Sequence, residues 1–286
     1  MWEEFSMIAG SSYIPKTRTP PKPAGEDAHF FNQTAQIIGV ADGVGSWAKK
    51  GVDAGEYARE LMRNAEQSVK GFAPAAVDPK SVIAAAFSRT KAAGSSTACI
   101  LSLAGNRLRA ANVGDSGFMV IRGGKIIFRS PVQLWSFNTP YKLERRVISG
   151  PELADEMAVE VEGGDVVVAA TDGLFDNLFP GEVEAVVDRC LSEGLEPEMV
   201  ACELARAAYL KSTCQSAKTP FAAVAAELGP RRRRGGIGGK RDDITVVVAF
   251  IIKAFAMILQ PLQCNKQGEV VSVERGMVTG RSRGYL

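Results

Sequence analysis

Three stretches of the sequence share one pattern: IIGVADG (37–43), VVVAATDG (166–173) and DDITVVVAF (242–250). In each, an apolar run of the length of a buried strand meets an acid at one end. A single Asp-Gly after a strand is usually only a turn. Because the pattern occurs three times, the interpretation as simple turns and the interpretation as a binding site are about equally supported. The acids concerned are Asp42, Asp172, Asp242 and Asp243, together with the nearby pair Glu26 and Asp27.

Clustered carboxylates repel one another unless a positive charge lies between them. The sequence has one histidine, His29, and five cysteines, none of them in a C-x-x-C pair. Carboxylate oxygens would therefore dominate a metal site, and they favour Mg²⁺ or Mn²⁺ over Zn²⁺. The single histidine argues against a histidine relay. The odd number and wide spacing of the cysteines favour a reducing compartment over a disulfide framework.

The hydrophobic pattern predicts strands, a helix pair, a strand meander, a second helix pair and a closing strand. Because strands do not alternate strictly with helices, two antiparallel sheets covered by helices are favoured over a doubly wound parallel sheet. Helices are predicted at 53–70, with Asp53 as N-cap, and at 79–93, 181–192 and 196–213. Strands are predicted at 37–41, 96–103, 107–113, 118–122, 125–128, 166–170 and 244–252.

The remaining segments carry weaker signals. Prolines predict irregular structure over residues 1–24, and residues 131–160 lack clear periodicity, as a mobile flap or a passive loop would. The run Arg231 to Arg234 lies among glycines and predicts a solvated loop rather than a nuclear signal or a patch for an acidic partner. We expect an irregular segment over 1–10, one large domain over 11–252, and a partly disordered tail over 253–286.

The composition is that of a globular protein, with 46% hydrophobic and 23% charged residues and a formal net charge of +2. So small a net charge argues against nucleic-acid binding through bulk charge. Residues 246–262 are apolar but interrupted by Lys253, which favours a buried strand over a membrane span. No secretory or transit pattern is visible at the start. We therefore expect an intracellular, soluble protein.

Six motifs resemble, in order, those of the metal-dependent protein phosphatases of the type 2C family. They are GEDAHF (25–30), VADGVGSW (40–47), GSSTA (94–98), NVGDSG (112–117), ATDGLFDNL (170–178) and DDITVVV (242–248). The resemblance covers residues 11–252 and is greatest to the compact subfamily of plant organelle-type and T-cell-activation-type phosphatases. It implies an α+β fold, a four-layer α-β-β-α sandwich of two antiparallel sheets flanked by helix pairs.

The resemblance also implies a function. A monomer would hydrolyse phosphoserine and phosphothreonine in a phosphorylated protein substrate, with a water activated at a centre of two Mg²⁺ or Mn²⁺ ions. No phosphoenzyme would be needed. The compartment implied is the chloroplast or the mitochondrion, with the cytoplasm as the alternative.

Residue roles follow from the same resemblance. Asp42, Asp172 and Asp242 resemble the family's catalytic acids, which also bind the metal ions. Asp42 would bridge both ions, and the other two acids would bind the first ion. Gly43 resembles the residue that offers its carbonyl to one ion. Glu26 resembles the acid of the second ion, directly or through water.

Three further acids match supporting positions. Asp27 would support Glu26, and Asp243 lies beside the ligand Asp242. Asp115 matches an acid that is linked to a weaker third ion in some relatives.

The sequence differs from the wider family at the residues for two functions, protonation of the leaving group and binding of the phosphate. Many members carry a histidine, proposed to protonate the leaving group, where this chain has Val44, as in the compact subfamily. Members often have an arginine near the entry that binds phosphate, and here Lys16 or Arg18 would have to serve. We interpret His29, one residue after the GEDA motif, as structural.

Rival functions find less support. Aspartate-nucleophile phosphatases need a D-x-D motif and cysteine phosphatases need a C-x5-R loop, and the sequence contains neither. A catalytically weak member that acts as a regulatory binding module is the remaining alternative. Acids at all four core positions argue against it.

Overall fold

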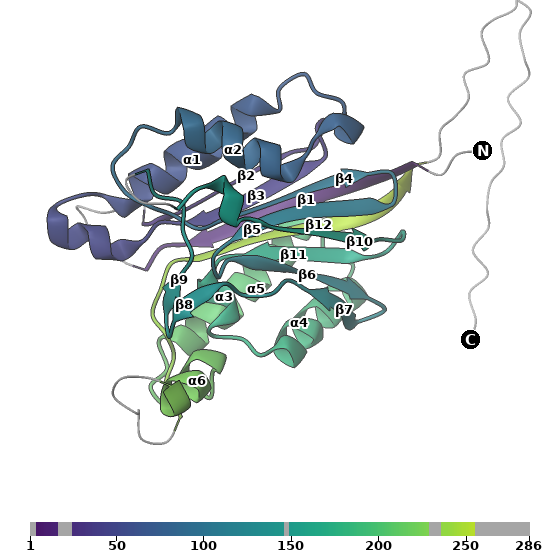
Figure 1. Ribbon diagram of the computed structural model, residues 1–286. Helices are drawn as coiled ribbons and strands as arrows, with labels where there is room; N and C mark the ends of the chain where they lie inside the picture. The colour runs from purple at the N-terminus through teal and green to yellow at the C-terminus, as the bar shows by residue number, and fades with distance from the viewer. Residues whose placement is uncertain (1–3, 17–24, 146–148, 229–235, 255–286) are drawn as a thin grey trace, which may run out of the picture.

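The computed structural model describes residues 4–16, 25–145, 149–228 and 236–254, which form four layers (Figure 1). Two five-stranded sheets, in the orders β1-β12-β11-β6-β7 and β10-β5-β4-β3-β2, lie face to face. Helices α1 (Ala54–Ser68) and α2 (Pro79–Arg89) cover the second sheet. Helices α4 (Pro180–Ser192) and α5 (Pro197–Ser212) cover the first. The predicted α-β-β-α sandwich is confirmed.

All of the strand pairs are antiparallel in the part of the chain that the structure describes. The first sheet contains β1 (Glu4–Ile14), β12 (Ile244–Ala254), β11 (Val166–Ala170), β6 (Gly117–Arg122) and β7 (Lys125–Arg129). The second contains β10 (Asp155–Glu160), β5 (Arg107–Val113), β4 (Ala98–Ala104), β3 (Ile37–Asp42) and β2 (Asp27–Asn32). The smaller elements are the hairpin β8 (Leu134–Ser136) and β9 (Thr139–Pro140), the helices α3 (Asp172–Phe175) and α6 (Pro220–Leu228), and the 3-10 turns η1 (Gly45–Lys50), η2 (Pro74–Ala76) and η3 (Pro151–Leu153).

The central strands are apolar throughout because both of their faces are buried. In β11, Val166 and Val168 pack in the core beneath α4 and α5, whereas Val167 and Ala169 pack in the core between the two sheets. Successive side chains of a strand point to opposite faces. A strand between two cores therefore needs apolar residues at every position, as the sequence VVVAA provides.

The helices begin as their capping residues predict. The Asp53 carboxylate accepts a hydrogen bond from the Gly55 amide at 3.1 Å, which confirms Asp53 as the N-cap of α1. Helix α2 was predicted to reach residue 93 but ends at Arg89. Thr90 has an extended backbone there and closes the helix with its hydroxyl, which donates to the Ala86 carbonyl at 2.8 Å.

The prediction of irregular structure over residues 1–24 is wrong for residues 4–14. This segment forms β1 and pairs along its whole length with β12, from Glu4 opposite Ala254 to Ile14 opposite Ile244. Its glycine and serines give a weak strand signal, and the partner strand lies at the far end of the described chain. The predicted boundary between residues 10 and 11 therefore falls inside β1. Strand β12 also continues two residues beyond its predicted end at residue 252.

Residues 131–160 contain more structure than their pattern indicated. They form the hairpin of β8 and β9, and the strand β10, which pairs with β5 at the edge of the second sheet. Five of the six residues of β10 alternate between exposed and half-buried, so no apolar run marks it. Strand β2 and helix α6 were also not predicted. The predicted C-terminal tail from residue 255 and the run Arg231 to Arg234 lie outside the described residues.

Among the described helices, none has the length and apolar character that crossing a bilayer requires. Cys99 and Cys190 are buried and free, and Cys202 and Cys214 are free as well.

Candidate metal centre

Antiparallel pairing brings the acid-bearing stretches to one end of the sandwich. Ala170, at the end of β11, lies opposite Val246 near the start of β12 and opposite Gly117 at the start of β6. In the other sheet, Asp42 ends β3 and Ala98 at the start of β4 lies opposite Val113 at the end of β5. The connection from β5 to β6 therefore crosses between the sheets at this same end, and it carries Asp115.

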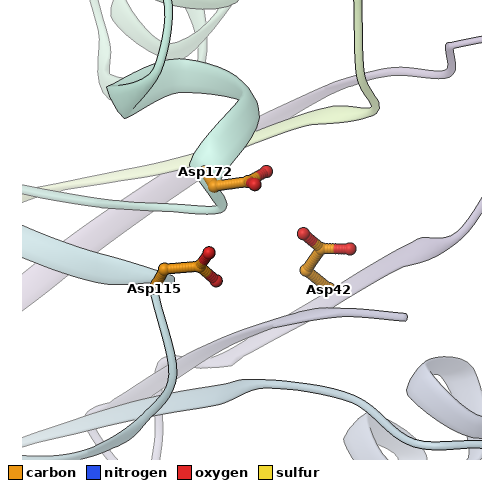
Figure 2. A group of neighbouring side chains, drawn as sticks. All are labelled: Asp42, Asp115 and Asp172. Carbon is orange, nitrogen blue, oxygen red and sulfur yellow. The ribbon is translucent and has the colours of Figure 1, made fainter. Parts of the chain in front are cut away.

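Three carboxylates converge here. One oxygen from each of Asp42, Asp115 and Asp172 lies within 4.8 Å of the other two. Figure 2 shows the three side chains pointing into one shared space from separate segments. Oδ1 of Asp115 and Oδ1 of Asp172 are buried and have no hydrogen-bond partner among the described residues.

The electrostatics of this cluster disfavour three free charges. Burial raises the pKa of Asp42, and the charge of Asp172 raises it further. Burial and then Asp172 raise the pKa of Asp115 to about 8, although Lys240 opposes them. Buried oxygens without donors, on carboxylates that repel one another, fit an oxygen-liganded divalent cation.

A cavity of about 430 Å³ opens over the cluster. It also reaches Val44, Thr97, the hairpin residues Asn138 to Pro140, and three lysines. The structure thus brings all of the predicted metal-binding residues to one cavity. They are Glu26, Asp42, Gly43, Asp115, Asp172 and Asp242.

Asp242 stands apart from the three-acid cluster. Its carboxylate pairs with the ammonium groups of Lys16 at 3.1 Å and of Lys240 at 3.3 Å. Burial raises the pKa of Asp242, Asp172 adds to the rise, and the two lysines oppose it.

Glu26 and Gly43 are joined through the main chain. The Gly43 amide donates to the Glu26 carbonyl at 3.0 Å. A Cβ atom at residue 43 would lie 2.5 Å from the carbonyl oxygens of both Glu26 and Ala54, so only glycine fits this close approach.

Asp243 does not line the cavity, and its carboxylate is fully used by neighbouring donors. It accepts hydrogen bonds from the Tyr13 hydroxyl at 2.9 Å, the Lys16 amide at 2.9 Å and the Glu26 amide at 3.1 Å. These bonds fasten the end of β1 and the start of β2 to the start of β12. Asp243 therefore positions the backbone of Glu26.

Asp27 is buried behind the cavity. Its Oδ2 accepts the hydroxyls of Thr171 and Thr245, each at 2.8 Å, while its Oδ1 has no partner among the described residues. Burial and then the charge of Asp243 raise the pKa of Asp27. Asp27 thus connects β2 with Thr171, the residue between β11 and α3, and with β12.

Lys240 is a site residue that sequence reasoning missed. Its ammonium pairs with Asp172 and, at 2.7 Å, with Asp176. Burial lowers the pKa of Lys240, but the charges of Asp172, Asp176 and Asp242 outweigh burial and hold the pKa well above its usual range. Asn177 fixes the lysine backbone, because its side chain accepts the Lys240 amide and donates to the Lys240 carbonyl. Nothing in the sequence indicated this role, because Lys240 lies in a glycine- and arginine-rich segment that is typical of a solvated loop.

Two hydroxyl residues were also missed. The Thr97 hydroxyl accepts the Asp42 amide at 2.9 Å and bonds with the Ser116 hydroxyl at 2.7 Å. The Ser96 hydroxyl donates to the Asp42 carbonyl at 2.8 Å. These contacts link the backbone at Asp42 with the turn that carries Asp115. The motifs GSSTA and NVGDSG contain these residues but do not reveal their pairing.

The other predicted residues have clear places. Lys16 and Val44 line the cavity, whereas Arg18 lies outside the described residues. His29 does not line the cavity; its ring contacts the Ser11 hydroxyl at 2.9 Å, and burial lowers its pKa.

Comparison with known proteins shows the family to which this chain belongs. The chain is 44% identical over 250 residues to probable protein phosphatase 2C 55 of Arabidopsis thaliana, a match that covers 86% of this chain and 52% of that protein. It is 43% identical over 235 residues to putative protein phosphatase 2C 24 of Oryza sativa subsp. japonica, covering 79% of this chain and 73% of that protein. The chain belongs to the protein phosphatase 2C family. No protein-family model matches it.

Solved structures agree in fold. The X-ray structure of the photosystem II phosphatase PBCP has a TM-score of 0.77 at 33% identity, covering 85% of this chain and 98% of that one. The catalytic domain of the serine/threonine phosphatase PstP, solved with two manganese ions, has a TM-score of 0.61 at 17% identity. That match covers 87% of this chain and 99% of the PstP chain.

Proposed function

We propose that this chain is a metal-dependent protein serine/threonine phosphatase that acts through two Mg²⁺ or Mn²⁺ ions, with a weaker third at Asp115. The observation that carries the proposal is the meeting of Asp42, Asp115 and Asp172 in one cavity, with buried oxygens that lack donors. Membership of the phosphatase 2C family and the manganese ions of the similar PstP domain support it.

In the proposed centre, Asp42 would help to hold both ions, and Asp172 and Asp242 would help to hold the first. Glu26 and the carbonyl of Gly43 would help to hold the second. Bound cations would supply Lewis acidity, which lowers the pKa of water and offsets the charge of the phosphoryl oxygens. Lys240 offsets part of the charge of Asp172, and Lys16 and Lys240 together hold Asp242 in place.

The chain's own residues would then organise the substrate. Lys16, Lys142 and Lys240 line the cavity and favour an anionic group there. Asn138 to Pro140 of the hairpin form another part of the lining. Val44 carries no proton to donate, so an alkoxide leaving group receives no help from that position.

We propose a monomer that acts on phosphoproteins in the chloroplast or mitochondrion, supported by similarity to the photosystem II phosphatase PBCP. Organelle fractionation with an antibody against the chain tests this location, and recovery only outside both organelles would contradict it.

Metal dependence tests the proposed function directly. We expect hydrolysis of an aryl phosphate and of a phosphothreonine peptide in Mn²⁺, loss of both in excess chelator, and recovery when Mn²⁺ is restored. Thiol-blocking reagents should leave the rate unchanged, because the proposed chemistry uses no cysteine. Full activity in chelator would contradict the proposal, and inactivity in every condition would favour the regulatory binding module.

A further inference from the structure

Lys16, Lys142 and Lys240 are the cations among the described residues that line the cavity over the candidate metal centre. A phosphorylated side chain carries a charge of about −1.5 to −2 at neutral pH and three strong acceptor oxygens. The three lysines differ in how far neighbouring acids already use their charge. They therefore offer a phosphate group unequal partners.

Two of the lysines are committed to acids. The Lys240 side chain is 13% exposed, and its ammonium pairs with Asp172 and, at 2.7 Å, with Asp176. A third carboxylate, that of Asp242, lies 3.3 Å from the Lys240 ammonium and 3.1 Å from that of Lys16. Both lysines thus offset the charge of predicted metal-binding acids, which leaves less of their own charge for a phosphate group.

Lys142 is the least committed of the three lysines. Its ammonium has one partner among the described residues, the Glu144 carboxylate at 3.3 Å, and its side chain is 34% exposed. A partly exposed ion pair contributes little, because water screens it. An ammonium group has three N–H donors. Lys142 therefore keeps donors for a ligand in the cavity.

A short ladder of backbone contacts places Lys142 close to the metal centre. Ser96 forms one antiparallel bridge with Gly43 and another with Leu143. The Ser96 amide donates to the Leu143 carbonyl at 3.2 Å, and the Ser96 carbonyl accepts the Leu143 amide at 2.8 Å. Neighbouring chains in such a ladder lie about 4.8 Å apart, so Leu143 lies two spacings, roughly 10 Å, from Gly43.

The direction of the Lys142 side chain follows from its neighbour. Leu143 is fully buried in the core that α1 and α2 cover. Because successive side chains of an extended chain point to opposite faces, Lys142 points away from that core, and it lines the cavity. Its flexible four-carbon stem lets the ammonium reach over the cavity toward Gly43 and Asp42.

We propose that Lys142, rather than Lys16, binds the phosphate group of the substrate. This inference rests on the proposed phosphatase function and adds a substrate-binding residue to it. The Lys142 ammonium exchanges its weak pair with Glu144 for charge-assisted hydrogen bonds to the phosphoryl oxygens. Lys16 and Lys240 stay with their carboxylates.

Kinetics in Mn²⁺ test this assignment. Lys142→Gln should raise three constants by about tenfold each, as the loss of a hydrogen bond to a charged group does. They are the KM for an aryl phosphate, the KM for a phosphothreonine peptide and the inhibition constant of inorganic phosphate. The value of kcat should change little, because bound substrate and transition state both make the contact. Lys142→Arg should restore all three constants, since guanidinium also donates to phosphate.

Thermal unfolding supplies a measurement that does not depend on turnover. In Mn²⁺, inorganic phosphate should raise the unfolding temperature of wild type and of Lys142→Arg, and should raise that of Lys142→Gln less. Calorimetric titration should give Lys142→Gln the Mn²⁺ affinity of wild type, because Lys142 pairs with none of the predicted metal-binding acids among the described residues.

Two further lysines provide the comparison and the control. Lys16→Gln should alter the Mn²⁺ affinity, because Lys16 pairs with Asp242, and should leave the inhibition constant of phosphate nearly unchanged. Lys49 is exposed and does not line the cavity, so Lys49→Gln should match wild type in every measurement.

An unchanged inhibition constant for phosphate in Lys142→Gln, in an enzyme that hydrolyses aryl phosphate, would overturn the assignment and leave the proposed function intact. A rise in KM confined to the peptide would also overturn it, because Lys142 would then contact the peptide outside its phosphate group. A rise in the inhibition constant for Lys16→Gln alone would assign phosphate binding to Lys16 instead. Absence of aryl phosphate hydrolysis by wild type in Mn²⁺ would remove the phosphatase proposal and this inference together.

Discussion

Asp42 and Asp243 stand at the same end of the sandwich, each where a strand meets a loop, yet their surroundings differ. Asp243 accepts three hydrogen bonds, from Tyr13, Lys16 and Glu26. The Asp42 side chain has no hydrogen bond or ion pair in the described part of the chain, and it faces Asp115 and Asp172. One acid fastens strand ends together, whereas the other is held among like charges.

The contrast separates acids that support the fold from acids whose surroundings fit a bound cation. A buried carboxylate that is supplied with donors stabilises the fold, because its charge is met by fixed dipoles. A carboxylate that is crowded with other acids and short of donors keeps its charge only when a cation lies beside it. Position at a strand end does not distinguish the two, but the supply of donors does.

The largest effect is expected from Asp42→Asn. We expect kcat/KM for an aryl phosphate in Mn²⁺ to fall by more than about 100-fold, beyond the loss seen when only a supporting group of a metal site is removed. The unfolding temperature in chelator should stay the same or rise, because the substitution removes one of three repelling charges. Retention of more than about a tenth of the activity, a barrier change under roughly 1.4 kcal/mol, would contradict the assignment.

The matched substitution Asp243→Asn should instead act on stability. In the variant, an NH₂ group replaces one carboxylate oxygen and cannot accept the hydrogen bond that this oxygen received. We therefore expect the free energy of unfolding to fall by roughly 2–3 kcal/mol. Denaturant titration in chelator measures this loss. If Asp243→Asn and Asp42→Asn changed stability equally, the distinction between the two acids would fail.

Lys240→Gln should have a smaller effect that depends on metal. The lysine pairs with Asp172, Asp176 and Asp242, so its loss leaves buried acids without a counter-ion. We expect about 2 kcal/mol of destabilisation in chelator, less than for a fully buried pair, and a smaller loss in Mn²⁺, which supplies positive charge. If the loss of unfolding free energy were the same in chelator and in Mn²⁺, Lys240 and the metal would not be offsetting the charge of the same acids.

The smallest effect is expected from Val44→His, at the cavity residue where many relatives carry histidine. In wild type, an aryl phosphate should be favoured over a phosphoserine peptide, because phenolate leaves without a proton donor. Histidine should narrow the ratio of the two kcat/KM values by roughly tenfold, below the effect of a well-placed general acid. Equal rates on both substrates in wild type would mean that another group already protonates the leaving oxygen.

The sequence predicted most of the fold because its central strands are buried on both faces. Runs such as VVVAA at 166–170 report burial directly, and the Asp53 cap reports a helix start. Among the edge strands, β7 was predicted, whereas β1, β2 and β10 were not. Strands β1 and β10 draw stability from a partner strand rather than from their own apolar pattern. For β1 that partner, β12, is separated by more than 200 residues of chain.

The sequence by itself indicated which acids would gather at one site, since the strand ends and the resemblance of six ordered motifs pointed to Glu26, Asp42, Asp115, Asp172 and Asp242, all of which line one cavity. Only the tertiary structure decided which hydrogen-bond donors and cations each acid contacts. Asp243 receives donors from β1 and from the start of β2, while Lys240 reaches Asp172 across a loop. Hydrogen bonds and ion pairs depend on positions in space to within a fraction of an ångström, and residues distant in sequence supply them, so no local pattern reports them.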